Sequence, residues 1–480
     1  MSPIDLRDAA RAVVAAHSFT VETPDETGLS PLAPEALGAG ARDLTGLLWS
    51  SIDNTETRDL DQLEYAERLA NGAIRVLLAV ADVDAYVPKD SALDRHAAQN
   101  TTSVYTGVTT FPMLPERLST DLTSLVEGET RAAMVVSLTI DASGAVAPAD
   151  VFRAVVRNRA KMAYEAVGAW LSNAAPPPRP ITAIPELADQ LRLQDEAAKR
   201  LRELRHEHGA LDLETIEANT VAVNGRVVDI SLVHKSVARE LIEDFMIATN
   251  SAVATFLEAR GVASIRRVVK APKRWPRIVA LAASDGVTLP PDPDAKALSQ
   301  FLAARRKAAP ERFADLSLTI VKLLGAGEYD VEVPGGEQQG HFGLAVDDYA
   351  HSTAPNRRYA DLVTQRQLKA VIAGAPSPYS VAELTEIAAH CTKMEDEGRV
   401  AEREVRKMAG AALLAPRTGE TFDAIVTGDT PKGVFVRLLH PPVEGRVVRG
   451  FERLDVGDRT RVRLLGTDVA KGFVDFAREA

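Results

Sequence analysis

The stretch 51-SIDNTETRDLDQLEYAERLANGAIRVLLAVADV-83 carries most of the structural information in this chain. Its second half holds two strand-like runs separated by Asn71-Gly72, and Asn-Gly in this position predicts a β-hairpin with a type I′ turn. Its first half concentrates three aspartates within nine residues, namely Asp53, Asp59 and Asp61, with Glu56 among them. The run of acidic side chains stops at Gln62. A crowded acidic segment therefore leads directly into a predicted sheet.

Periodic patterns outside this stretch predict an α+β fold. Strands are expected at 133–140 and 151–158, where β-branched and apolar residues dominate. Residues 1–19 have the pattern of a short amphipathic helix. Apolar residues recur at helical spacing in later segments, namely 160–171, 185–208, 237–260, 275–290, 294–308, 310–325, 357–373 and 380–414. We expect a mixed β-sheet core surrounded by helices.

The last part of the chain has a different pattern of apolar and turn residues. Residues 418–479 contain short alternating strands interrupted by Gly and Pro, which is typical of a small all-β OB-fold barrel. Four parts are therefore expected: a short N-terminal segment (1–45), an α+β domain (46–375), a helical connector (376–415) and the barrel (416–480).

The composition limits the classes of function. Of the 480 residues, 46% are hydrophobic and no apolar run has membrane-spanning length. The single Cys391 excludes an intrachain disulfide and a multi-cysteine metal site, and a reducing cytoplasm fits it. The net charge of −11 argues against a nucleic-acid partner, but the distribution of charge decides. Basic runs occur at 153–161, 265–277, 304–313 and 357–369.

The acidic stretch has two interpretations. A single aspartate before a strand commonly caps a turn. Three neighbouring aspartates repel one another unless a cation neutralises them, and Mg²⁺ is the natural partner of such carboxylates. If 59–61 is extended, Asp59 and Asp61 share a face and Gln62 points away; if it is a turn, all three converge.

Carboxylates around Mg²⁺ combined with basic surfaces indicate phosphodiester chemistry, in which the metal activates water and stabilises charge at phosphorus. A cationic side chain should then bind the phosphate. Arg357 and Arg358, which follow Pro355, are the candidates, although their residue types also suit the start of an ordinary helix.

The stretch 51–66 resembles the catalytic aspartate motif of the RNB family, the exoribonucleases of the RNase II and RNase R type. Further segments match the family in order, namely 79–97, 101–125, 159–167, 239–250 and 341–362. Residues 418–480 resemble the S1-type RNA-binding OB-fold of these enzymes. The resemblance covers about 47–375 and the tail.

The resemblance implies a 3′→5′ hydrolytic exoribonuclease that needs Mg²⁺, or Mn²⁺ in its place, and releases nucleoside 5′-monophosphates from single-stranded RNA. It implies catalytic roles for Asp53, Asp59, Asp61 and Arg357, with Asp61 the most important. It also implies RNA-binding roles for Tyr105, Tyr164, Glu243 and Arg358, with Glu243 preferred to Asp244 for the register. We expect a cytoplasmic monomer without membrane contact.

Three features depart from the family pattern. Gln62 stands where the family usually has a fourth aspartate; with Asp53 and Asp61 it would be a metal ligand without charge, so we expect a weaker metal site. The family's SPIRRY reads APNRRY at 353-TAPNRRY-359, which keeps Arg357 but changes its support. The two cold-shock-type domains that usually precede the catalytic domain in this family do not fit into residues 1–45. We therefore expect the C-terminal barrel and the N-terminal segment to bind RNA without them.

Two alternatives remain. The loss of a carboxylate at Gln62 favours an RNA-binding protein with this fold and weakened catalysis. Against it, Arg357, Tyr164 and Glu243 persist, whereas a decayed enzyme is expected to lose more. A Mg²⁺ phosphohydrolase of small phosphates is the third option, and it leaves the OB-like tail unexplained.

Overall fold

The structure is a computed structural model that describes residues 5–24, 26, 29–32, 40–214, 217–233, 235–430, 433–454 and 456–479. Parts of the N-terminal segment expected at 1–45 lie outside these residues. The expected N-terminal helix is present as α1 (Arg7–Ala16).

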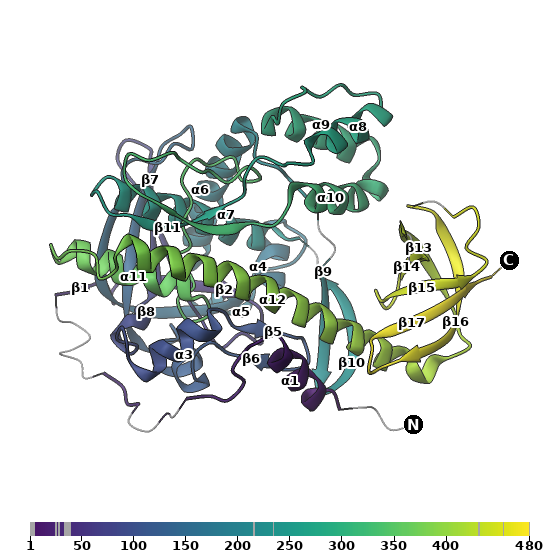
Figure 1. The fold of residues 1–480 in the computed structure, drawn as a ribbon. Coiled ribbons are helices and arrows are strands. Elements are labelled where there is room, and N and C mark those ends of the chain that lie inside the picture. The colour runs from purple at the N-terminus through teal and green to yellow at the C-terminus, as the bar shows by residue number, and fades with distance from the viewer. Residues whose placement is uncertain are drawn as a thin grey trace.

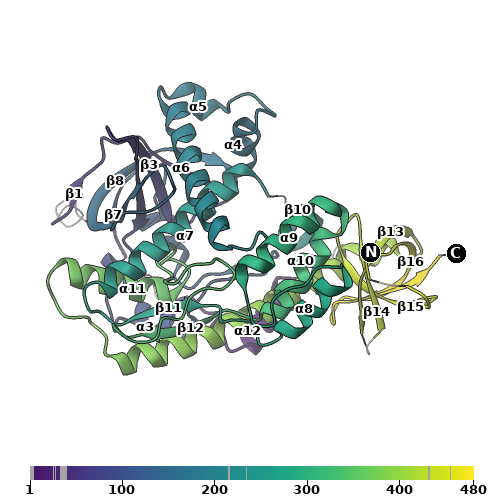
Figure 2. The same ribbon diagram turned by 90° about the horizontal axis from the view of Figure 1, so that it is seen from above.

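A strongly curved β-sheet forms the centre of the larger part of the molecule (Figures 1 and 2). Its strands are β1 (Arg42–Asp43), β2 (Trp49–Asp53), β3 (Gln62–Arg68), β4 (Ile74–Ala81), β7 (Thr130–Ile140) and β8 (Asp150–Ala163). The hydrogen-bonded order is β1-β8-β2-β3-β4-β7, and β7 also pairs with β8. The pairing of β2, β3, β4, β7 and β8 therefore runs in a closed ring. β8 is parallel to β1 and β2 and antiparallel to β7.

The predicted hairpin is present, but the predicted turn type is wrong. β3 and β4 are antiparallel, with Arg68 opposite Ile74. A type I′ turn needs positive φ at both central residues; here Gly72 has φ +82°, and Asn71 is not among the described residues of positive φ. The Gly72 amide donates to Leu69 O (2.9 Å), which fits a type I turn followed by a glycine bulge. The Asn71 side chain stabilises this turn by accepting from the Ala73 amide.

Two layers of helices cover the sheet. On one side its apolar residues pack against α4 (Tyr164–Leu171), α6 (Leu187–His208) and α7 (Val237–Glu258), with the short α5 (Arg179–Ala183) beside them. On the other side they pack against α3 (Ala92–Asn100), α11 (Tyr359–Ile372) and the first half of α12 (Val381–Leu414). Figure 2 shows α6 and α7 beside the sheet, and Figure 1 shows α12 extending from this core to the C-terminal barrel.

The expected helix at 160–171 begins four residues late. Residues 160–163 belong to β8, because Ser50 to Asp53 of β2 pair with Ala160 to Ala163. Pairing with a neighbouring strand overrides the helical pattern here, and α4 starts only at Tyr164.

Several smaller elements complete this part. Three helices, α8 (Trp275–Ser284), α9 (Ala295–Ala308) and α10 (Pro310–Leu324), form a separate small core. The sequence patterns did not reveal three two-stranded pairs, which are β5 (Val104–Tyr105) with β6 (Thr110–Phe111), β9 (Glu217–Val223) with β10 (Arg226–Val233), and β11 (Ser264–Val268) with β12 (Glu328–Glu332). Single turns of helix lie at Val83–Ala85, Leu118–Leu122 and Ala415–Arg417.

The C-terminal part is a closed five-stranded barrel, as the sequence predicts. Its strands are β13 (Thr421–Thr430), β14 (Gly433–Leu438), β15 (Glu444–Arg449), β16 (Arg459–Asp468) and β17 (Phe473–Arg478), in the order β13-β14-β15-β17-β16. Apolar side chains at alternate positions fill its interior, as expected for a small barrel. The predicted fold class, α+β with a small all-β barrel at the end, is confirmed. None of the helices in the described parts of the chain is long and apolar enough to span a lipid bilayer.

Candidate active site

Asp53 is placed by the end of β2. The strand stops there, and the carboxylate accepts hydrogen bonds from the Asn54 amide (2.6 Å) and from the Thr57 hydroxyl (2.9 Å). Lys161 of β8 holds the same loop by donating from Nζ to the Thr55 carbonyl (2.9 Å). Burial raises the pKa of Asp53, and the nearby Asp59 carboxylate adds to this effect. These hydrogen bonds fix the loop after β2 and the position of the Asp53 carboxylate.

Asp61 comes immediately before β3 and is almost completely buried, with 3% of its surface exposed. Its Oδ1 accepts from Asn356 Nδ2 (3.0 Å) and its Oδ2 accepts from Arg357 Nε (3.2 Å). Burial raises the pKa of Asp61 to about 6, and the Arg357 charge opposes that rise. A buried carboxylate with two positioned donors is a costly arrangement, which makes Asp61 the centre of the candidate site.

Arg357 and Asn356 reach Asp61 because the start of α11 is held in place from outside. The Ser103 amide donates to Arg357 O (3.0 Å), and the Tyr359 amide donates to Thr101 O (2.7 Å). The Thr123 hydroxyl donates to Asn356 Oδ1 (2.6 Å). These contacts fix the backbone and orient the Asn356 amide toward Asp61. Asn356 is a site residue that sequence reasoning treated only as a departure in the motif.

Asp59, in the loop between β2 and β3, is paired with an aromatic side chain of β5. The Tyr105 hydroxyl donates to Asp59 Oδ2 (3.3 Å), and the Tyr105 amide donates to Glu402 of α12 (2.8 Å). Tyr105 is 41% exposed, yet the protein packed around it raises its pKa. Its ring is therefore accessible beside the aspartates, as an RNA-stacking residue requires.

Tyr164 lies on the other side of Asp53. It is the first residue of α4, and the guanidinium of Arg239 lies 4.4 Å from the centre of its ring. Arg239 Nη2 also donates to Asn54 Oδ1 (2.7 Å), which connects α7 to the loop of Asp53. Burial raises the pKa of Tyr164, and the carboxylates of Asp53 and Glu64 add to the rise. Arg239 is a further site residue that the sequence did not reveal.

The structure separates Glu243 from Asp244. Asp244 is buried and binds Arg202 Nε (2.9 Å) as well as Arg205, so it is committed to the contact between α6 and α7. Glu243 is exposed on α7, although its surroundings still raise its pKa. Glu243 is therefore the one of the two whose carboxylate is not committed to a described ion pair, and its contact with RNA stays a prediction.

Arg358 has different surroundings from those expected of an RNA-binding side chain. Its Nε and Nη2 donate to the two carboxylate oxygens of the buried Asp361 (2.8 and 2.7 Å). Asp361 in turn accepts from the Ala354 amide (2.8 Å). This pair holds the start of α11 together, so Arg358 supports the position of Arg357, and its contact with RNA stays a prediction.

Gln62 and Glu64 lie on the same face of β3, because side chains alternate along a strand. Gln62 is half-buried. Glu64 is completely buried, and neither of its carboxylate oxygens has a hydrogen-bond partner among the described residues. Burial raises the pKa of Glu64 well above its usual value, and the Asp53 carboxylate raises it further. A buried carboxyl group without a donor is costly when ionised, so it is neutral or lies beside a cation.

Glu64 was not singled out from the sequence, although its position was a usable signal. It follows Gln62 by two residues, the spacing that places both side chains on one face of a strand. The family pattern has an aspartate at the position of Gln62. This chain lacks that carboxylate but has one at Glu64, on the same face of the strand.

The donor set suits a divalent cation of the Mg²⁺ type. Carboxylate and amide oxygens of Asp53, Asp61 and Gln62 are the ligands that such a cation prefers. The buried carboxyl of Glu64, which no donor among the described residues reaches, adds a further acidic group whose pKa the Asp53 carboxylate raises. The aspartates do not form a tight trio, so few of them would bind one cation directly, with water and phosphate completing its coordination.

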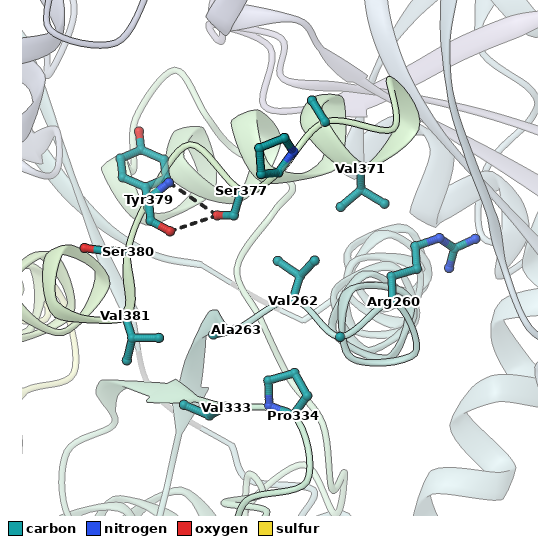
Figure 3. A pocket seen from close by; sticks show the side chains of 13 residues that line it. Arg260, Val262, Ala263, Val333, Pro334, Val371, Ser377, Tyr379, Ser380 and Val381 are labelled. Atoms are coloured by element: carbon teal, nitrogen blue, oxygen red, sulfur yellow. Dashed lines mark hydrogen bonds between the residues drawn. The ribbon is translucent and has the colours of Figure 1, made fainter.

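A hollow of about 730 Å³ lies elsewhere, between the end of α7, the end of β12 and the loop from α11 to α12 (Figure 3). Its lining includes Arg260, Val262, Val333, Val371 and Tyr379. None of the predicted site residues lines it, so it is not the candidate active site.

Two family models match the chain. The RNB domain matches residues 41–374, and the C-terminal S1 domain of RNase II-type exonucleases matches residues 420–479. Ribonuclease R of Thermotoga maritima is 33% identical over 451 residues, which are 90% of this chain and 61% of that protein. Exoribonuclease 2 of Erwinia tasmaniensis is 32% identical over 438 residues, 88% of this chain and 64% of that protein. The chain thus spans less than two thirds of the length of these relatives.

Solved structures share the fold. RNase R of Mycoplasma genitalium, in complex with ribose-methylated single-stranded RNA, superposes with a TM-score of 0.87 at 23% identity, covering 99% of this chain and 78% of that one. Yeast Ssd1, described as a pseudonuclease, superposes with a TM-score of 0.70 at 18% identity, covering 91% and 55%. Because the RNB model matches well over half of its residues, this chain belongs to the RNB family.

Proposed function

We propose that this protein is a 3′→5′ hydrolytic exoribonuclease that degrades single-stranded RNA to nucleoside 5′-monophosphates with the aid of Mg²⁺. The observation that carries the proposal is the buried Asp61, held by Asn356 and Arg357 next to Asp53 and Asp59. Membership of the RNB family and similarity to relatives named ribonuclease R and exoribonuclease 2 support it.

The residues of the chain take distinct parts in this reaction. A bound Mg²⁺ or Mn²⁺, held by Asp53, Asp61 and Gln62, would supply the activation of water and neutralise charge at the phosphate. Asp59 and Asp61 set the negative field that attracts this cation. Arg357 uses Nε for Asp61, and its side chain is 44% exposed, so its terminal nitrogens are available to a phosphate oxygen. The Arg357 guanidinium thereby links the acidic cluster to the RNA backbone.

The RNA-binding residues surround the same cluster. Tyr105 and Tyr164 offer rings on which bases stack without sequence preference. Glu243, exposed on α7, would accept a hydrogen bond from a ribose hydroxyl, and the 2′-hydroxyl is the group that distinguishes RNA from DNA. The barrel carries exposed aromatic residues, Phe451 and Phe473, that suit an S1-type RNA-binding surface. We further propose that one chain acts as a monomer in the cytoplasm.

The second candidate is an RNA-binding protein of the RNB fold with weakened catalysis. The lack of a carboxylate at Gln62 favours it, and likeness to a pseudonuclease shows that this fold occurs in a protein so described. The persistence of the Asp61 contacts favours the active enzyme.

The position of a radioactive label tests the proposal. The same single-stranded RNA is labelled at its 5′ end or at its 3′ end and incubated with protein and Mg²⁺. A 3′→5′ hydrolase releases the 3′ label at once as a nucleoside 5′-monophosphate, while the 5′ label passes through a shortening ladder. Tight binding without release of either label, in Mg²⁺ and in Mn²⁺, identifies the RNA-binding alternative. Release of the 5′ label first contradicts the polarity.

A further inference from the structure

A second acidic cluster lies outside the candidate active site. It consists of Glu258 at the end of α7, Glu332 at the end of β12, and Asp348 in the segment between β12 and α11. One carboxylate oxygen from each lies within 4.8 Å of the other two, which no other trio of His, Cys, Asp or Glu achieves in the described part of the chain. We propose that these three side chains bind a structural divalent cation that joins the three segments.

Burial of a carboxyl group with a free oxygen is the independent support for this site. The Glu332 side chain is 6% exposed, and its Oε1 accepts from Arg266 Nη2 (3.3 Å). Its Oε2 is buried and has no partner among the described residues, and the same holds for Asp348 Oδ1. The Glu332 and Asp348 carboxyl groups lie within hydrogen-bonding reach of each other, so either a shared proton or a cation between them neutralises these two oxygens. Both belong to residues whose carboxylates converge.

The charges around the cluster do not balance. The positive charge beside it is Arg266, which is 2% exposed and lies on β11 next to β12. This single positive charge faces the three carboxyl groups of Glu258, Glu332 and Asp348. The Asp347 carboxylate is near enough to raise the pKa of Asp348 as well. Burial and this repulsion raise the pKa of Glu332 and of Asp348. A cation of charge two compensates the excess that Arg266 leaves.

The ligand atoms specify the class of cation. All three are carboxylate oxygens, which hard cations such as Ca²⁺, Mg²⁺ and Mn²⁺ prefer, and neither thiol nor imidazole belongs to the trio. Glu258 and Asp348 are half-buried, so water can reach the site and complete the coordination.

The three carboxylates come from the end of α7, the end of β12 and the segment between β12 and α11, so a cation bound to them would join these segments. Figure 3 shows Arg260, just beyond the end of α7, and Val333 and Pro334, just beyond the end of β12, on neighbouring walls of the hollow. Asp348 belongs to the segment that continues to Asn356 at the candidate active site. Cation binding would therefore fix that segment against α7 and β12.

Mn²⁺ binding to the whole chain tests this proposal. Bound Mn²⁺ is counted by electron paramagnetic resonance for the wild type, Asp348→Asn, Glu258→Gln and Asp61→Asn. We expect Asp348→Asn and Glu258→Gln each to weaken one Mn²⁺ site roughly tenfold or more. Asp61→Asn should leave that site unchanged and affect a different one. The result does not depend on RNA hydrolysis, so failure here and failure of the proposed activity are distinguishable.

Thermal unfolding gives a second readout with opposite signs. In chelator, Asp348→Asn should raise the Tm because it removes part of the repulsion, whereas Ca²⁺ should raise the Tm of the wild type but not of Asp348→Asn. If Asp348→Asn does not fold, the same Tm comparison is made with Glu258→Gln, because the Glu258 side chain is only half-buried. Two results would overturn the proposal: both variants bind as many Mn²⁺ ions as the wild type, or Ca²⁺ and Mn²⁺ leave the wild-type Tm unaltered. In either case the cluster is neutralised by protonation instead of by a cation.

Discussion

Replacing Asn356 by alanine removes one of the two donors that hold Asp61. Asn356 is 1% exposed, and its Nδ2 donates to Asp61 Oδ1 at 3.0 Å. Its Oδ1 accepts from Thr123, whose hydroxyl also reaches Leu118 O at 2.8 Å and so keeps a partner in the variant. The loss therefore falls on Asp61, which retains only Arg357 Nε among its described side-chain donors.

The size of the effect follows from the type of bond. A hydrogen bond to a charged group contributes about 1.5–3 kcal/mol, which corresponds to a rate loss of roughly 10- to 150-fold if the ionised Asp61 is required. Burial raises the pKa of Asp61 to about 6, so its carboxylate form is lost as the pH falls through that value. Loss of a donor to the carboxylate raises this pKa further and moves the acid limb of the pH–rate profile up by about one to two pH units.

Single-turnover hydrolysis of 5′-labelled single-stranded RNA measures the effect from pH 6 to pH 9. Mg²⁺ is kept subsaturating, because protons and the cation compete for the same carboxylate. Asn356→Ala should be slowest relative to the wild type near pH 6–7 and recover at pH 9. Thr123→Val, which removes the other bond of Asn356 without touching Asp61, is the matched control and should lose less. Equal rates for Asn356→Ala and the wild type, or an equal loss at every pH, would refute the reasoning.

Three further predictions concern neighbouring side chains. Glu64→Leu should raise the unfolding free energy in chelator by roughly 1–3 kcal/mol, measured in urea at pH 8, because it removes a buried carboxyl without partners; a loss of stability contradicts this. Gln62→Asp should lower the Mg²⁺ concentration for half-maximal hydrolysis roughly tenfold, because it adds a charged ligand; an unchanged metal titration contradicts this. Tyr164→Ala should weaken binding of a short oligonucleotide roughly 5- to 150-fold by fluorescence anisotropy in an Asp61→Asn background, because one stacking surface is lost; equal affinity contradicts this.

Local patterns were sufficient to predict most of the fold. The Asn71-Gly72 hairpin depends on residues that are close in sequence, and helices such as α7 and α12 have long apolar periodicity. The barrel was predictable because each strand is short and bounded by turn residues. The helix expected from residue 160 failed because pairing between β8 and β2 is a long-range contact.

The candidate site was predictable only in its local part. The aspartates fall in one stretch of nine positions, but Asn356 meets Asp61 across 295 residues of sequence. The Arg358–Asp361 pair has the local i, i+3 spacing of a helix start, but no local pattern shows that Arg357 turns to Asp61. The burial of Glu64 depends on the register of β3 between β2 and β4, which is set by the folded sheet.

The central claim is that the carboxylate of Asp61 is required for cleavage rather than for RNA binding. The most direct measurement compares the wild type with Asp61→Asn, a nearly isosteric change, in Mg²⁺-dependent release of nucleoside 5′-monophosphates and in affinity for the same single-stranded RNA. We expect Asp61→Asn to bind the RNA as tightly as the wild type in chelator and to release no product in Mg²⁺. Undiminished release by Asp61→Asn would contradict the claim.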